Sequence, residues 1–84
     1  MNEELKAELI IPFASIDHAK IAYNTLRVDT EPRKNLISKQ LTLDNNLIKV
    51  SWSSHESKIL RVSVNSFLDH LNSVLETIEL FSNQ

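Results

Sequence analysis

The sequence contains no glycine and no cysteine. Loops that cradle phosphates need glycine so that backbone N–H groups can approach the ligand closely. The lack of glycine therefore excludes a P-loop, a dinucleotide-binding fingerprint and a GXXG clamp on RNA. Without cysteine the chain has neither a disulfide framework nor a thiolate zinc site, which is consistent with a reducing compartment.

Long hydrophobic runs and an excess of basic charge are also missing. No apolar run approaches the roughly 18 residues of a membrane span, and the N-terminus MNEELKAELII is acidic and lacks the basic start of a secretory signal. The formal net charge of −2 gives no overall attraction to nucleic acid, so a contact with RNA would need a local basic patch. We expect a protein of the cytoplasm and nucleus with no membrane partner.

The 84 residues have the composition of a single soluble globular domain, 1–84, with 42% hydrophobic and 24% charged residues. A chain of this length hides only about 60% of the surface of its unfolded state. A partner is therefore an expected source of additional stability.

The first part of the chain alternates between strand and helix patterns. Residues 5–13 alternate apolar and polar side chains and predict a strand that ends at Pro12. Ser15 is a predicted N-cap for a helix that ends near Arg27. Two further alternating runs flank Asp44–Asn46, whose residue types tolerate positive φ, and they predict a β-hairpin.

The remaining residues predict one long helix, from about Ser54 to Phe81, opened by a capping box of Ser53 and Glu56. The order of elements is therefore β-α-β-β-α. We predict an α+β fold in which two helices pack on one face of a three-stranded antiparallel sheet.

The long helix carries two neighbouring strips of side chains. The first predicts the core face, because its apolar residues recur at spacings of four and three. Its members are Leu60, Val64, Phe67, Leu71, Val74, Ile78 and Phe81, widened by Leu68 and Leu75. The second strip has short side chains where a solvated helix would carry lysine and glutamate. It consists of Ile59, Val62, Ser63, Ser66, Ser73 and Thr77.

We predict that the second strip is part of a surface that binds a partner, because short side chains let another helix approach closely. Ile21 of the first helix also points away from the apolar stripe of that helix, so it joins this surface. The predicted partner interface is Ile21, Ile59, Val62, Ser63, Ser66 and Ser73. The alternative is that these are ordinary exposed helix positions, where serine is common.

Three segments of the chain carry a family resemblance. They are LIIPFASIDHAKIAYNTLRVDTEPR, the hairpin after it, and LRVSVNSFLDHLNSVLETIELF. The most specific pieces are IPF before the first helix, L-x-V-D-x-E-P-R in the loop, and LRVSVNSFLD at the start of the last helix. With these segments in this order, the chain resembles the small dimerising subunit of the KEOPS complex (also called EKC), the CTAG/LAGE-like family.

The resemblance implies a subunit that performs no chemistry and holds no cofactor, in a complex that makes threonylcarbamoyladenosine beside the anticodon of tRNAs. One implied partner is the catalytic threonylcarbamoyltransferase subunit, which would share a helical bundle with this chain. The other is itself (a homodimer) or a look-alike small subunit (a heterodimer). tRNA would be held indirectly or weakly, and roles in telomere upkeep and transcription are implied for the complex. Whether pairing uses sheet edges or helices stays open.

The candidate tRNA contacts are basic residues: Arg27, Arg33, Lys34 and Arg61. The first three flank a polar loop where they would reach phosphates, and the match to the family in this loop favours Arg33. The alternative is a solvated loop in which Asp29 and Glu31 neutralise these charges. Arg61 lies at the edge of the core stripe and either orders the start of the long helix or meets tRNA.

No catalytic or metal site is predicted. His18, His55 and His70 lie on different elements without ligand spacing. Asp29 and Glu31 lie in a loop without the burial that tunes paired carboxylates for acid–base catalysis. A competing interpretation is a stand-alone KH-like RNA-binding module, since β-α-β-β-α arrangements are similar to KH domains, but the lack of glycine and of a basic face argues against it. A small metabolic enzyme would have no candidate site.

Overall fold

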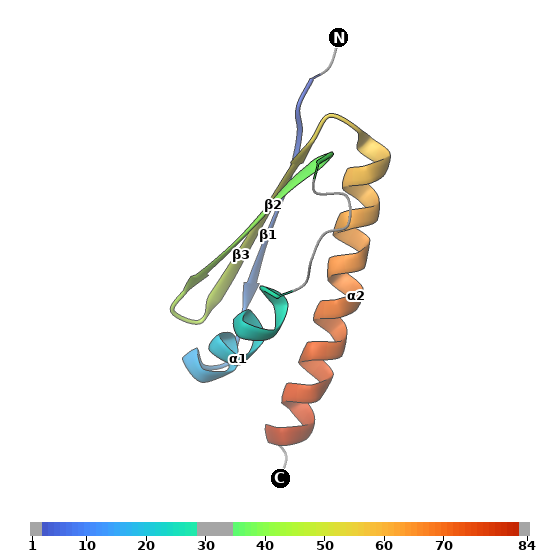
Figure 1. Ribbon diagram of the computed structural model, residues 1–84. Coiled ribbons are helices and arrows are strands. Elements are labelled where there is room, and N and C mark those ends of the chain that lie inside the picture. The colour runs from blue at the N-terminus through green and yellow to red at the C-terminus, as the bar shows by residue number, and fades with distance from the viewer. Residues whose placement is uncertain (1–2, 29–34, 83–84) are drawn as a thin grey trace.

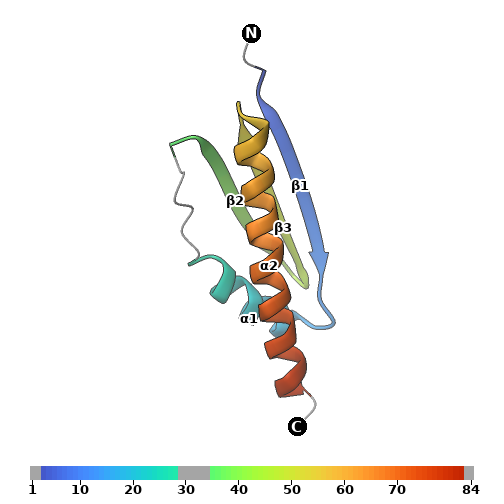
Figure 2. The ribbon, with the colours of Figure 1, turned by 90° about the vertical axis from the view of Figure 1, so that its right-hand side faces the viewer.

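The computed structural model describes residues 3–28 and 35–82 (Figure 1). Within these residues the order is β1 (Leu5–Pro12), α1 (Ile16–Leu26), β2 (Ile37–Asp44), β3 (Leu47–Ser54) and α2 (Ser57–Ser82). The strands form one antiparallel sheet in the order β1-β3-β2, and both helices cover the same face of it (Figure 1 and Figure 2). The predicted α+β fold and its order of elements are confirmed.

β3 lies in the centre of the sheet and supplies the middle of the core. Ile48, Val50 and Trp52 point toward the helices and are buried, while the residues between them point to the open face. The register places Leu9 of β1 and Leu41 of β2 opposite Val50, on the helix-covered side. The alternation read from the sequence therefore separates the covered face of the sheet from the open one.

The hairpin between β2 and β3 turns without glycine. Asp44 and Leu47 are paired, so Asn45 and Asn46 form a two-residue turn. Asn45 has a φ of 55°, a left-handed conformation that asparagine tolerates better than most residues. The side-chain amide of Asn46 donates a hydrogen bond to the Phe13 carbonyl (2.9 Å), and the Phe13 N–H donates to the Asn46 carbonyl (2.8 Å). The turn is thereby tied to the segment that leads into α1.

α1 is capped at its start and has small side chains where it meets the sheet. The Ser15 hydroxyl accepts a hydrogen bond from the His18 N–H (3.1 Å), which confirms the predicted N-cap. Ala19 and Ala22 are fully buried, and side chains this short let the helix lie close to β2 and β3. Leu26 completes the buried face of the helix.

Phe67 anchors α2 on the sheet. Its side chain is 1% exposed and meets the Trp52 ring edge to face, with the ring centroids 5.4 Å apart. The Lys39 Nζ lies 5.5 Å from the centroid of the same Phe67 ring, within the range of a cation–π interaction. The predicted core stripe is confirmed at the buried Leu71, Val74 and Ile78, with Leu60 and Val64 half-buried against them.

α2 begins later than predicted and is preceded by a different serine. β3 remains paired with both neighbouring strands up to Ser54, and Ser54, not Ser53, is buried, because it follows Trp52 by two residues and so points to the covered face of the sheet. The Ser54 hydroxyl accepts a hydrogen bond from the Glu56 N–H (3.1 Å) and donates one to the Leu36 carbonyl (2.7 Å). The helix itself begins at Ser57.

Truncation of Phe67 tests the packing of α2. Phe67→Ala removes the ring that contacts Trp52, and we expect it to lower the free energy of unfolding by about 3–5 kcal/mol. Phe67→Leu keeps much of the volume and should lower it by about 1 kcal/mol. Urea denaturation followed by circular dichroism measures both changes. The control Glu79→Ala, at an exposed position of the same helix, should stay within about 0.5 kcal/mol, and an equal loss in all three variants would contradict the packing described.

Candidate partner-binding groove

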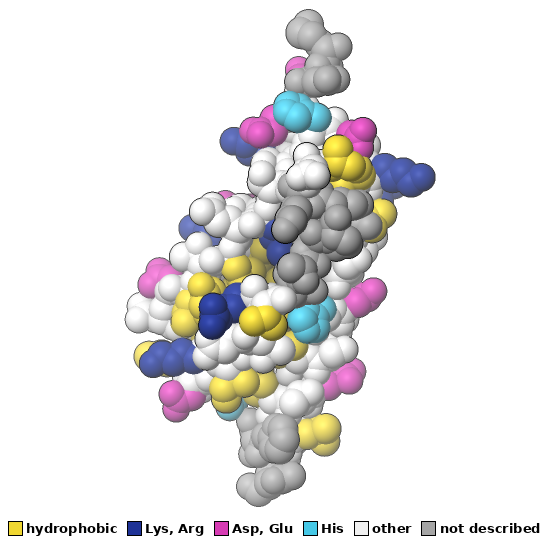
Figure 3. Space-filling model, in the orientation of Figure 1, with side chains coloured by type: hydrophobic (Ala, Val, Ile, Leu, Met, Phe, Trp, Pro, Cys, Tyr) yellow, Lys and Arg dark blue, Asp and Glu magenta, His cyan; other side chains and the backbone are white. Residues whose placement is uncertain are grey.

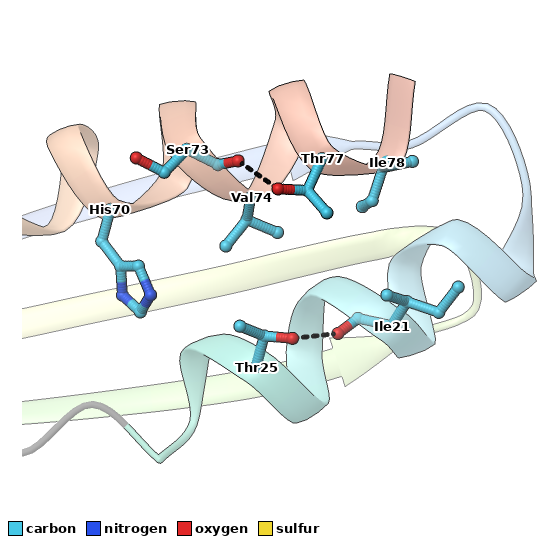
Figure 4. A pocket seen from close by; sticks show the side chains of 7 residues that line it. All are labelled: Ile21, Thr25, His70, Ser73, Val74, Thr77 and Ile78. Carbon is cyan, nitrogen blue, oxygen red and sulfur yellow. Dashed lines mark hydrogen bonds between the residues drawn. The ribbon is translucent and has the colours of Figure 1, made fainter. Parts of the chain in front are cut away.

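An open groove of about 250 Å³ lies between α1 and α2. The lining residues are Ile21 and Thr25 of α1 and His70, Ser73, Val74, Thr77 and Ile78 of α2 (Figure 4). α1 has 11 residues and α2 has 26, so α1 can cover only a part of the flank of α2 that faces it. The difference in helix length therefore leaves a surface that this chain does not fill by itself.

The hydroxyl groups in the groove are turned toward the backbone of their own helices. Thr25 Oγ1 donates a hydrogen bond to the Ile21 carbonyl (3.0 Å), and Thr77 Oγ1 donates to the Ser73 carbonyl (3.0 Å; Figure 4). Ser73 Oγ likewise donates to the Asp69 carbonyl (3.4 Å). These bonds to the carbonyl four residues earlier satisfy the hydroxyl donors. A partner would therefore meet mainly methyl and methylene groups and would leave no hydroxyl donor unsatisfied when it covers them.

Exposed aliphatic side chains extend the apolar surface beyond the groove. Ile21 is 54% exposed, and Val28, just after α1, is more exposed still. On α2, Leu80 is 70% exposed and Val62 is 40% exposed. Hydrophobic side chains gather over the region of α1 on the face shown in Figure 3. The exposed acidic residues Asp69 and Glu76 lie on the same side of α2 as Val62 and Leu80, seven residues apart, so the exposed aliphatic side chains along this helix alternate with charge.

The structure places the predicted interface residues at different depths. Ile21 and Ser73 line the groove. Val62 and Ser66 are exposed on the same side of α2 as Ser73, because spacings of four and seven residues are close to whole turns. Ile59 is half-buried and packs against the core. Three residues of the α2 strip therefore share one exposed side, and Ile59 lies at its inner border.

Ser63 belongs to the core of this chain, which corrects its prediction as an interface residue. It is 2% exposed in the single chain, so it has no surface left for a partner to cover. It precedes Phe67 by four residues, about one turn, and so faces the sheet as Phe67 does. Its short side chain lets α2 lie close to the sheet of the same chain.

Sequence reasoning missed Thr25 and His70 as residues of the groove. Thr25 follows Ile21 by four residues and His70 precedes Ser73 by three, spacings that place each pair on one side of its helix. The spacing was therefore a usable signal. Both residues have polar side chains, which do not by themselves indicate an apolar surface. Thr25 presents its methyl group to the groove only because its hydroxyl is hydrogen-bonded to its own helix.

The basic residues considered for tRNA are dispersed. Arg27 is exposed directly after α1, and Arg61 is exposed on the first half of α2. Arg33 and Lys34 lie outside the described residues. The exposed charged residues further along α2 are acidic: Asp69, Glu76 and Glu79. Acidic side chains follow the outer edge of α2 in Figure 3, which makes this part of the helix unsuited to a phosphate backbone.

Residues 3–28 and 35–82 contain neither a metal-binding cluster nor a membrane-spanning helix. No three histidine or carboxylate side chains there come close enough together to hold a metal ion. None of the described helices combines the length and the apolar character needed to cross a bilayer. The groove itself offers aliphatic, hydroxyl and imidazole groups.

The chain is similar to known proteins in sequence. The model of a family described as transcription factor Pcc1 matches residues 6–79. The chain is 38% identical over 73 residues to EKC/KEOPS complex subunit Lage3 of Mus musculus and 36% identical over 73 residues to EKC/KEOPS complex subunit LAGE3 of Homo sapiens. Both matches cover 87% of this chain, but 49% of the mouse protein and 51% of the human one. The chain thus spans about half the length of these two relatives.

The chain is also similar to a solved structure. A chain of the crystal structure of the binary complex Gon7-Pcc1 matches with a TM-score of 0.84 at 26% sequence identity. The similarity covers 92% of this chain and 95% of that chain. A match of this extent includes the sheet and both helices that form the groove.

The orientation of the hydroxyls can be tested with two exchanges of similar shape. Thr77→Val removes a hydroxyl that is bonded within its own helix at an exposed position, and we expect the free energy of unfolding to change by less than about 1 kcal/mol. Val74→Thr puts a hydroxyl at a buried position of the same groove, and we expect a loss of about 1–3 kcal/mol. Urea denaturation measures the free energy of unfolding of both variants. A loss in Thr77→Val as large as that in Val74→Thr would show that the Thr77 hydroxyl has another role.

Proposed function

The chain belongs to the Pcc1 family, and from this membership we propose that it acts as a non-catalytic assembly subunit of an EKC/KEOPS complex. The mouse and human relatives are named as subunits of that complex, and the similar solved structure is a complex of Pcc1 with a second protein. The observation that carries the proposal is the apolar groove that this small domain leaves uncovered. On this proposal the chain performs no chemistry and supports tRNA threonylcarbamoyladenosine synthesis by joining other subunits.

We propose that a helix of the catalytic threonylcarbamoyltransferase subunit lies in the groove. The exposed flank of α2 from Val62 to Leu80 is about 27 Å long at 1.5 Å per residue. An amphipathic helix of about 18 residues has the same length and would place apolar side chains against Ile21 and the groove, as in other helix-in-groove complexes, and polar side chains opposite Asp69 and Glu76, which lie on the same flank. The hydroxyls that are hydrogen-bonded within their own helices support this arrangement, because a partner helix that covers them leaves no hydroxyl donor unsatisfied.

The second proposed partner is another small subunit, either a second copy of this chain or a look-alike chain. The similar solved structure is a binary complex of Pcc1 with Gon7, which supports a second partner for this chain. We further propose that the assembly functions in the cytoplasm and nucleus.

We propose that this chain contacts tRNA only weakly or indirectly. Arg27, Arg33, Lys34 and Arg61 remain the candidate contacts. The formal net charge of −2 and the acidic second half of α2 disfavour strong binding of a phosphate backbone by this chain alone.

Docking in the groove can be tested with a pair of adjacent substitutions. Ser73→Arg places a long charged side chain on the groove wall, and we expect it to weaken co-purification with the catalytic subunit at least tenfold. Asn72→Arg makes the same change one residue earlier, on the exposed side away from the groove, and should leave co-purification unchanged. Both positions are exposed, so circular dichroism should show intact folding in both variants. Unchanged co-purification of Ser73→Arg would remove the groove from the interface.

tRNA binding separates the assembly role from the competing role as a stand-alone RNA-binding module. We expect the isolated chain to bind tRNA at physiological salt with a Kd no tighter than the range of non-specific electrostatic binding, about 1–100 µM. Fluorescence anisotropy with labelled tRNA measures this, and Arg27→Glu combined with Arg61→Glu should weaken the residual binding further. Submicromolar binding by the isolated chain would favour the RNA-binding module over the assembly subunit.

A further inference from the structure

The charged side chains of α2 run against the dipole of their own helix. A helix has a partial positive charge at its N-terminus and a partial negative charge at its C-terminus, so acidic residues stabilise the first turn and basic residues the last. The first turn of α2 has no acidic residue, and its last turn has no basic residue. Lys58 and Arg61 lie near the start of the helix instead, and Asp69, Glu76 and Glu79 follow toward its end. In the isolated chain this distribution of charge disfavours the helix.

The carboxylates of α2 have no ion-pair partner within the described part of the chain. The ion pair found there joins Lys6 to Glu4, next to β1, and none involves Asp69, Glu76 or Glu79. α1 differs in this respect, since its first turn carries an acidic residue as the helix dipole favours. A placement that disfavours the fold and is not compensated inside the chain points to a function of these residues outside it.

Asp69 and Glu76 lie along the outer border of the groove. Successive residues are about 100° apart around a helix, so these two, seven residues apart, differ in direction by only about 20°. Ser73 of the groove wall lies about 40° from Asp69 and about 60° from Glu76 around the helix. Both acidic side chains are exposed. A helix that lies in the groove therefore passes beside both carboxylates.

The third carboxylate belongs to the other flank of α2. Glu79 lies about 120° from Ser73 around the helix, close to the direction of Leu68 and Leu75. Leu68 and Leu75 are each 37% exposed, although their spacing predicted a place in the core. Glu79 is therefore separated from the groove and is not part of its border.

The α1 side of the groove adds a further carboxylate and no positive charge. Asp17 precedes Ile21 of the groove wall by four residues and so shares its side of the helix. Lys20 and Arg27 lie about 140° and about 160° from Thr25 around α1, on the side away from the groove. Within the described residues, the borders of the groove thus carry acidic side chains and no lysine or arginine.

We propose that the partner helix in the groove has a basic edge, with lysine or arginine side chains seven residues apart that lie opposite Asp69 and Glu76. This inference rests on the proposed function, since it states the chemistry of the helix that the groove holds. Seven residues span about 10.5 Å in either helix, so two basic residues of one helix can meet both carboxylates. Apolar residues three or four positions away from them would face Ile21 and Val74 in the groove.

The charges on the border select a partner, while the apolar groove holds it. Exposed ion pairs add little affinity, but complementary charge speeds association and rejects partners of the wrong sign. Carboxylates also repel a phosphate backbone, so this border disfavours nucleic acid. Basic groups beside the second half of α2 would at the same time neutralise the negative end of its dipole, which its own residues leave uncompensated. The carboxylates that disfavour the helix in the free chain would then stabilise the complex.

Charge reversal tests the chemistry of the partner. Asp69→Lys combined with Glu76→Lys should raise the Kd for the purified catalytic subunit about tenfold or more at low ionic strength, mainly through slower association. The matched control is Glu8→Lys combined with Asp44→Lys, which changes the net charge equally on the open face of the sheet and should bind as the unmodified chain does. Surface plasmon resonance at about 50 mM and about 500 mM salt measures both rates, and the higher salt should reduce the difference between the border variant and the unmodified chain.

The thermal stability of the free chain separates a partner contact from a structural role. The unfolding midpoint of the border variant should stay or rise, because lysine near the C-terminus of a helix is favourable, and a lower midpoint would assign the carboxylates to the fold and overturn the proposal. Equal weakening in the border variant and the control, or binding of the unmodified chain that does not respond to salt, would also overturn it. If Ser73→Arg abolishes binding while the border variant binds normally, docking in the groove stands and the basic edge is wrong. If neither change affects binding, the docking itself is wrong.

Discussion

The edge-to-face contact between Phe67 and Trp52 fixes the rotation of α2 over the sheet, and the surfaces of the molecule follow from that rotation. With Phe67 turned toward the central strand, Ser66 faces the flank that α1 partly covers and Leu68 faces the flank beside β1. A rotation by one residue would bury Leu68 and bring Phe67 to the surface. One aromatic contact therefore decides which side chains of the helix remain available.

The two flanks of α2 have different chemistry, so they suit different partners. The flank toward α1 presents threonine and serine whose hydroxyls are already bonded to their own helix, and it forms a groove. The flank toward β1 presents Leu68 and Leu75 next to a strand with an unpaired edge among the described residues. Because α2 separates the two surfaces, occupation of one leaves the other accessible. On the proposed assembly role, this arrangement gives one small domain two separate surfaces for other chains.

The sequence was sufficient for the elements and for most of the core. Alternating residues in the strands, the Asn-rich turn and the spacing of Phe67, Leu71 and Val74 are local signals, and the structure confirms each of them. The sequence does not show that Ser63 is buried, because a small polar residue at the border of the apolar stripe is equally typical of core and surface. Its burial depends on how closely α2 approaches the sheet. The sequence favours Ser53 over Ser54 because the end of strand pairing is not visible in a pattern of residue types. Of the residues that line the groove, the sequence indicates Ile21 and Ser73. It does not indicate Thr25, because the hydrogen bond that turns this hydroxyl toward its own helix cannot be read from residue types.

The hydrogen bonds between Asn46 and Phe13 have a consequence for the order of folding. A two-residue hairpin closes within microseconds, whereas this contact bridges 33 positions along the chain. The segment that leads into α1 is held by a turn that must already exist, so we expect the hairpin to form before α1 docks on the sheet. The groove needs α1 in place and would then be among the last features to form, so that a binding surface for a partner helix would exist only in the completely folded chain.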